Sequence, residues 1–104
     1  MKVAFVGLGR IGQMHLSIVR ELFPHIECIG VDPFITDHQK QLLDISILTM
    51  DQVLFDSEIK AVFITCSTKL HVELIYRCMT HNKHIFCEKP VSDNLRLLKQ
   101  LIED

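Results

Sequence analysis

The sequence lacks the features that mark membrane, secreted or nucleic-acid-binding proteins. No stretch approaches the roughly 20 apolar residues that a membrane-spanning helix needs. The apolar stretch at the amino terminus runs for only about five residues before a glycine, which is too short for a secretory signal. Lysine and arginine total 11 against 13 aspartates and glutamates, without a basic run, so neither nucleic acid nor an anionic membrane is an expected partner. We expect a cytoplasmic protein.

Cysteine spacing provides no sign of a metal or dithiol site. The four cysteines form no C-x-x-C pair and lack zinc-site spacing, and the histidines include no pair at metal-ligand spacing. Three cysteines lie in or beside apolar runs, which favours free buried thiols in a reducing compartment. A metal site or a catalytic thiol is the less favoured interpretation. The four are Cys28, Cys66, Cys78 and Cys87.

Repeats, low-complexity tracts and linkers are absent as well, which leaves one domain over residues 1–104. A chain of about this size buries roughly two-thirds of its unfolded surface, so an independent core is possible. Its hydrophobic fraction of 48% is ordinary for a globular domain.

The chain does contain a glycine-rich turn between an apolar strand and a helix. Residues 3–12 read VAFVGLGRIG, and Asp32 follows twenty positions after the last of these glycines. In a dinucleotide site Gly7 would permit the tight turn, Gly9 would let a pyrophosphate approach, and Gly12 would let the helix lie close. The first-turn N–H groups of that helix lack intrahelical acceptors and can bind phosphate. Asp32 would accept hydrogen bonds from ribose hydroxyls.

Apolar runs alternate with helical patterns along the rest of the chain. We predict strands over 2–6, 27–32, 45–50, 61–66 and 84–87. Helices are expected after the glycine turn up to Pro24, over 36–43 with a Thr36 or Asp37 cap, and for one turn over 51–55 with an Asp51 cap. Two more are expected after a Ser67 or Thr68 cap and after a Ser92 cap.

Helical spacing also predicts which side chains the helices bury. The expected apolar stripes are Ile11, His15, Ile18, Val19 and Leu22 in the first helix, Val72, Ile75, Tyr76 and Met79 in the fourth, and Leu95, Leu98, Leu101 and Ile102 in the last.

This alternation predicts an α/β fold of Rossmann type, a doubly wound parallel sheet with helices on both faces. About five strands in the order 3-2-1-4-5 would place a ligand crevice at the carboxyl ends of strands one and four. Two further segments reach the same edge, residues 65–71 after strand four and the triplet Glu88-Lys89-Pro90 after strand five.

Together with the glycine turn, these segments resemble the amino-terminal domain of the Gfo/Idh/MocA oxidoreductase family over essentially the whole chain. The resemblance implies NAD or NADP binding and hydride transfer at a carbinol or carbonyl carbon of a sugar, polyol or related molecule. It also implies that Lys89 lies beside the nicotinamide ribose and substrate as the catalytic candidate, supported by Glu88. One departure is Cys66-Ser67-Thr68, where the family commonly has Thr-Pro-Asn; Ser67 and Thr68 can still cap a helix.

We predict NAD rather than NADP, because the Asp32 carboxylate repels a 2′-phosphate and no arginine follows closely. Arg10 either touches the pyrophosphate or faces solvent, and both remain open. A packed side chain is favoured for His71, with a ligand role as the alternative. The predicted cofactor-binding set is Gly7, Leu8, Gly9, Arg10, Ile11, Gly12, Asp32, Cys66, Ser67, His71, Glu88 and Lys89.

Members of the resembled family carry a second α/β domain that supplies most of the substrate pocket, and nothing in this sequence corresponds to it. We therefore expect NAD binding with little turnover, a small-molecule substrate held only with a partner or the missing domain, and self-association through exposed apolar surface around 95–102 and the crevice. Whether the chain acts as an enzyme is left open. The alternatives are a standalone NAD-binding regulatory or sensor module and a degenerate interaction domain.

Overall fold

A computed structural model of the chain describes residues 1–66 and 71–87, with the side chains of 71 and 72 excepted. One parallel sheet runs in the order β3-β2-β1-β4-β5, which confirms the predicted Rossmann-type topology. Its strands are β1 (Lys2–Val6), β2 (Glu27–Val31), β3 (Ser46–Ile47), β4 (Ile59–Ile64) and β5 (His84–Cys87). The helices are α1 (Arg10–Leu22), α2 (Asp37–Leu43), α3 (Met50–Phe55) and α4 (His71–Thr80).

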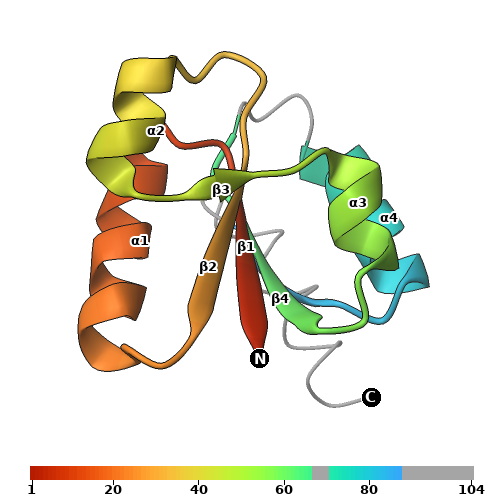
Figure 1. The fold of residues 1–104 in the computed structure, drawn as a ribbon. Coiled ribbons are helices and arrows are strands. Elements are labelled where there is room, and N and C mark those ends of the chain that lie inside the picture. Colours follow the sequence, from red (N-terminus) through yellow and green to blue (C-terminus); the bar gives the residue numbers. More distant parts are fainter. Residues whose placement is uncertain (67–70, 88–104) are drawn as a thin grey trace.

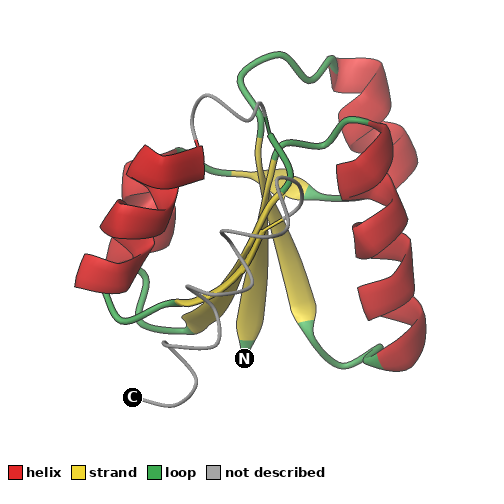
Figure 2. Ribbon diagram, turned by 180° about the vertical axis from the view of Figure 1, so that it is seen from behind, coloured by secondary structure: helices red, strands yellow, loops and turns green. Residues whose placement is uncertain are grey.

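The helices cover the sheet from both sides. Helices α1 and α2 lie on one face, and α3 and α4 lie on the other (Figure 1); the view from behind shows the same layers (Figure 2). Strand β1 contributes to both cores, because alternate side chains of a strand point to opposite faces. Val3 and Phe5 belong to one buried cluster, whereas Ala4 and Val6 belong to the other.

Three strand predictions were wrong at their ends. Strand β2 ends at Val31, one residue before the predicted Asp32. Strand β4 begins two residues before the predicted 61–66 and ends at Ile64, because Ile59 pairs with Lys2 and is fully buried. Strand β3 has only two residues instead of six, since it pairs with Ile29 and Gly30 alone before the chain turns into α3.

Helix α3 is capped by Thr49 rather than by Asp51. The Thr49 hydroxyl accepts from the Gln52 N–H at 3.2 Å, and the Gln52 side-chain oxygen accepts from the Thr49 N–H at 2.8 Å. This reciprocal capping box repeats at Thr36 and Gln39, which confirms the predicted Thr36 cap of α2. The Ser67, Thr68 and Ser92 caps and the last helix lie outside the described residues.

The predicted buried stripe of α1 was largely wrong. Its buried residues are Gly12, Leu16 and Val19, whereas Ile11, Ile18 and Leu22 are exposed. Of the predicted stripe only Val19 is buried, and the buried line of α1 begins at Gly12, which lies against the Gly7 carbonyl and the Thr65 hydroxyl. In helix α4 the predicted Ile75 is buried together with Leu74 and Cys78, whereas the predicted Tyr76 and Met79 are exposed. The side chain of the predicted Val72 lies outside the described residues.

No helix of the described segments is long and apolar enough to cross a membrane. Within those same segments no group of three or more histidines, cysteines or acids could hold a metal ion.

Candidate functional site

A cavity of about 460 Å³ opens at the carboxyl edge of the sheet, where the strand order reverses between β1 and β4. This is the position at which open α/β sheets bind ligands, and the volume is typical of a small-molecule site. Its lining comes from the ends of β1, β2 and β4 and from the helices α3 and α4. The lining residues are Val6, Gly7, Gly9, Val31, Asp32, Pro33, Phe34, Met50, Thr65, Cys66 and Leu74.

The three glycines of the turn lie in different local environments, and each explains the absence of a side chain in its own way. Gly7 has φ of +93°, and a Cβ there would lie 2.7 Å from the Cys66 backbone nitrogen, so no other residue fits without strain. A Cβ on Gly12 would lie 2.0 Å from the Gly7 carbonyl oxygen. Gly12 therefore permits α1 to pack closely against the turn itself, whereas the sequence pattern predicted close packing against the preceding strand.

Gly9 differs, because a Cβ on it would meet no atom within 4 Å. It lines the cavity and caps α1 without a side-chain hydrogen bond. The first hydrogen bond within α1 runs from the Gln13 N–H to the Gly9 carbonyl at 2.9 Å. The N–H groups before Gln13 in the first turn therefore have no acceptor within the helix. Gly9 thus leaves open the space over a helix N-terminus that carries no acid in its first turn, an arrangement suited to an anionic group.

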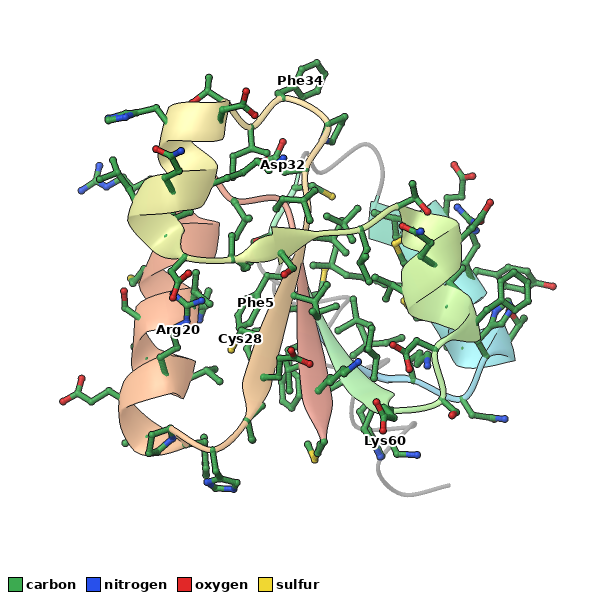
Figure 3. All side chains as sticks on the ribbon, in the orientation of Figure 1. Phe5, Arg20, Cys28, Asp32, Phe34 and Lys60 are labelled. Carbon is green, nitrogen blue, oxygen red and sulfur yellow. The ribbon has the colours of Figure 1, made fainter. Side chains whose placement is uncertain are left out.

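Asp32 lies directly after β2 and contacts the turn. Its Oδ2 accepts from the Leu8 N–H and its Oδ1 from the Phe34 N–H, both at 2.9 Å. In Figure 3 Asp32 lies between the helical layers, while Phe34 projects at the top of the molecule, where it is 89% exposed. The predicted acid is therefore in the cavity, held by two backbone donors, and it retains lone pairs for further donors.

Backbone and side-chain bonds fix the turn on both sides. The Gly7 N–H donates to the Val31 carbonyl at 2.8 Å, and the Gly7 carbonyl accepts from the Thr65 hydroxyl at 2.6 Å. The Leu8 carbonyl accepts from the Gln13 side-chain amide at 3.0 Å. The Leu8 side chain is buried, so this residue presents only its backbone to the site.

Three of the thiols are protonated at neutral pH, and one of them, Cys66, lines the cavity. Burial raises the pKa of Cys66, and the nearby Asp32 carboxylate raises it further. Burial also raises the pKa of Cys78 to about 11 and raises that of Cys28. Because the thiolate is the reactive form, none of these three has the character of a catalytic nucleophile.

The structure brings part of the predicted site together. Gly7, Gly9, Asp32 and Cys66 share the cavity, whereas the side chains of Arg10 and Ile11 are exposed at the start of α1. His71 begins α4. Ser67, Glu88 and Lys89 lie outside the described residues.

The predicted cofactor-binding set left out seven lining residues, namely Val6, Val31, Pro33, Phe34, Met50, Thr65 and Leu74. Thr65 had a usable signal, because it is a polar residue at the end of an apolar strand. The sequence analysis brought Thr65 to this edge within the segment 65–71 but did not include it in the cofactor-binding set.

The model of the oxidoreductase family with an NAD-binding Rossmann fold, Gfo/Idh/MocA, matches residues 1–104. The chain belongs to the Gfo/Idh/MocA oxidoreductase family. Myo-inositol 2-dehydrogenase of Thermotoga maritima is 31% identical over 108 residues, covering 100% of this chain and 32% of the relative. Inositol 2-dehydrogenase of Salmonella typhimurium is 27% identical over 109 residues, covering 99% of this chain and 32% of the relative.

Among solved structures, scyllo-inositol dehydrogenase from Lactobacillus casei with bound NAD(H) and scyllo-inositol superposes with a TM-score of 0.73. It is 26% identical, and the match covers 99% of this chain and 33% of that one. The chain thus spans about a third of the length of the relatives it matches. It is an NAD-binding Rossmann domain of a family of oxidoreductases.

Proposed function

We propose that this domain binds NAD(H) in the cavity at the carboxyl edge of the sheet and supplies the cofactor half of a polyol dehydrogenase. The observation that carries the proposal is the joint placement of Gly9 and Asp32 on that cavity. Open space at Gly9 accommodates a pyrophosphate over the start of α1, and Asp32 lies where a ribose would follow. The inositol dehydrogenases among the relatives support a sugar or polyol as the substrate class.

NAD(H) is preferred to NADP(H) in this proposal. The Asp32 carboxylate, positioned by the Leu8 and Phe34 N–H groups, favours the hydroxyls of an unmodified ribose and repels a 2′-phosphate. The two residues after Asp32, Pro33 and Phe34, carry no cation to neutralise such a phosphate.

When bound, the nicotinamide supplies the hydride acceptor or donor, and this chain's residues bind and orient it. The family resemblance implies that Lys89 would lie beside the nicotinamide ribose and the substrate, supported by Glu88. Substrate must also be held in near-attack geometry, which we assign to a further domain or a partner chain. The isolated chain is therefore expected to bind cofactor with little turnover.

Calorimetric titration of the 104-residue chain with NAD⁺, NADH and NADPH tests the proposal, with Asp32→Ala as the variant. We expect NADH to bind more tightly than NADPH and the Asp32→Ala change to reduce that ratio. The ratio is the informative quantity, because general damage to the turn weakens both dinucleotides alike. Absence of binding by the unaltered chain would overturn the proposal and favour a degenerate interaction domain. Binding with NADPH preferred would overturn the assigned role of Asp32.

A complementary assay adds an inositol substrate to the NAD⁺-loaded chain and follows NADH absorbance. Turnover comparable with that of full-length family members would show that no further domain is needed. Cofactor binding with negligible turnover is the expected result. A standalone sensor module would give the same result, and restoration of turnover by a partner chain or a further domain would distinguish the dehydrogenase from the sensor.

A further inference from the structure

We propose that Thr65 is a positioning residue for the dinucleotide turn: its hydroxyl fixes the peptide between Gly7 and Leu8, and through that peptide the carboxylate of Asp32. The inference rests on the proposed function, because it concerns how the same cavity is prepared for NAD(H). Thr65 was not in the predicted cofactor-binding set, and it directly follows β4, whereas the glycine turn follows β1.

The Gly7–Leu8 peptide is held at both of its polar ends. Its carbonyl accepts from the Thr65 hydroxyl at 2.6 Å, and its N–H donates to Asp32 Oδ2 at 2.9 Å. The same hydroxyl lies 3.2 Å from the Val6 carbonyl, a second acceptor on the preceding peptide. One peptide therefore links the end of β4 to the end of β2 across the central strand.

This peptide needs such a restraint because glycine precedes it. Gly7 has φ of +93°, and glycine loses more conformational freedom on folding than any other residue. A rotation of the peptide would withdraw the Leu8 N–H from Asp32. Restraining a site before the ligand arrives reduces the ordering cost of binding, so the hydroxyl contributes to affinity by holding the turn in place.

The hydroxyl can be separated from the rest of Thr65. The Thr65 backbone N–H donates to the Val6 carbonyl at 2.9 Å and so extends the β1–β4 pairing independently of the side chain. Thr65→Val keeps this bond and the β-branched shape while removing the hydroxyl. Thr65→Ser keeps the hydroxyl and removes only the methyl group.

Thr80→Val provides the matched control. Its hydroxyl also donates to a backbone carbonyl, that of Arg77 at 2.8 Å, but it lies in the last turn of α4 and does not line the cavity. The Thr80 hydroxyl also lies 3.2 Å from His81 Nδ1, as the Thr65 hydroxyl lies 3.2 Å from the Val6 carbonyl. Both substitutions therefore remove a hydroxyl with one short bond to a carbonyl and one longer contact, and only Thr65 contacts the turn.

The experiment combines calorimetry with NADH and hydrogen exchange of the Leu8 amide in the ligand-free 104-residue chain. We expect Thr65→Val to weaken NADH binding about fivefold, the size of one neutral hydrogen bond, and to accelerate Leu8 exchange by a similar factor. Thr65→Ser should restore both values to within about twofold, and Thr80→Val should leave both unchanged. Urea unfolding of each variant excludes global destabilisation as the cause of faster exchange.

Unchanged NADH affinity in Thr65→Val would overturn the inference while the proposed function stood. Weaker binding with unchanged Leu8 exchange would also overturn it, because the loss would not pass through the turn. If the unaltered chain bound no NADH, the proposed function would fail on that result alone. The binding role of Thr65 would fall with it, and Leu8 exchange would still decide whether the hydroxyl restrains the turn.

Discussion

The Leu8 N–H donates to Oδ2 of Asp32 at 2.9 Å, joining the glycine turn after β1 to the acid after β2. Asp32 is therefore a structural residue as well as a candidate ribose ligand. The other carboxylate oxygen is occupied in the same way by the Phe34 N–H. An arrangement in which both oxygens accept from backbone donors cannot be reproduced by an amide.

Asp32→Asn should therefore destabilise the protein more than loss of a charge would. The amide nitrogen must face one of the two N–H groups. Facing the exposed Phe34 N–H is the less costly choice, and it loses one hydrogen bond worth about 1 kcal/mol. Urea unfolding measures the change, with Asp37→Asn as the control, since the Asp37 side chain is 99% exposed. The control should change stability by less than about 0.5 kcal/mol. Equal effects of the two changes would contradict the assigned hydrogen bonds.

Gly7→Ala and Gly9→Ala should separate folding from binding. Alanine at 7 meets backbone atoms at 2.7–2.9 Å in a positive-φ conformation, so we expect a loss of about 3 kcal/mol or more in the free energy of unfolding. Alanine at 9 has open space, and its cost at the N-cap should stay within about 1 kcal/mol.

The Gly9→Ala protein should nevertheless bind NADH at least about tenfold more weakly, because the methyl group occupies the space for the pyrophosphate. Calorimetry on this variant, alongside its unfolding curve, checks the prediction. A stable Gly9→Ala chain with undiminished affinity would place the pyrophosphate elsewhere.

Cys66 should report occupancy of the cavity by its alkylation rate. The thiol is half-buried and lines the cavity, and its raised pKa makes iodoacetamide labelling slow near neutral pH and faster toward pH 9. At an NADH concentration ten times its Kd, the labelling rate should fall about tenfold. Mass spectrometry of the labelled peptides provides the measurement. Cys78 is the control: it is fully buried with a pKa of about 11 and should label slowly with or without NADH. A Cys66 labelling rate that did not depend on NADH would argue against the proposed site.

Lys83 ties the start of β5 to the α3–β4 connection. It is only 7% exposed, and its ammonium donates to the Asp56 carbonyl at 2.6 Å and the Ile59 carbonyl at 2.7 Å. Lys83→Met leaves both carbonyls without this donor, so we expect a loss of about 1–3 kcal/mol near pH 7 by urea unfolding. Lys40→Met, at a far more exposed lysine, is the control and should have little effect.

Burial also lowers the pKa of Lys83 below its usual 10.5, which gives a pH signature. Between the lowered folded-state pKa and 10.5, the unfolded chain binds more protons than the folded one at this residue. The contribution of Lys83 to stability therefore rises with pH across that window and is constant below it. Unfolding curves from pH 7.5 to 10.5 should show a rise in the unaltered protein relative to Lys83→Met. Parallel pH profiles would contradict the assigned effect of burial.

Local patterns in the sequence predicted the fold and the centre of the site. The alternation of apolar runs predicted the strand order, since parallel strands need helical crossovers. The bounds of β1 and β5 and the Thr36 cap also follow from neighbouring residues. The Thr49–Gln52 capping box is also a local pattern visible in the sequence, although the sequence analysis predicted Asp51 as the cap.

The sequence by itself determined the glycine turn and the acid that follows β2, because backbone geometry and turn chemistry are properties of short segments. Only the tertiary structure decided which side of α1 is buried, where β4 ends, and that the Thr65 hydroxyl meets the Gly7 carbonyl. Gly7 and Thr65 are separated by 58 residues, and Leu8 and Asp32 by 24. Contacts at such separations depend on the pairing register of β1 with β2 and β4, which is set by packing of the whole core rather than by either segment alone.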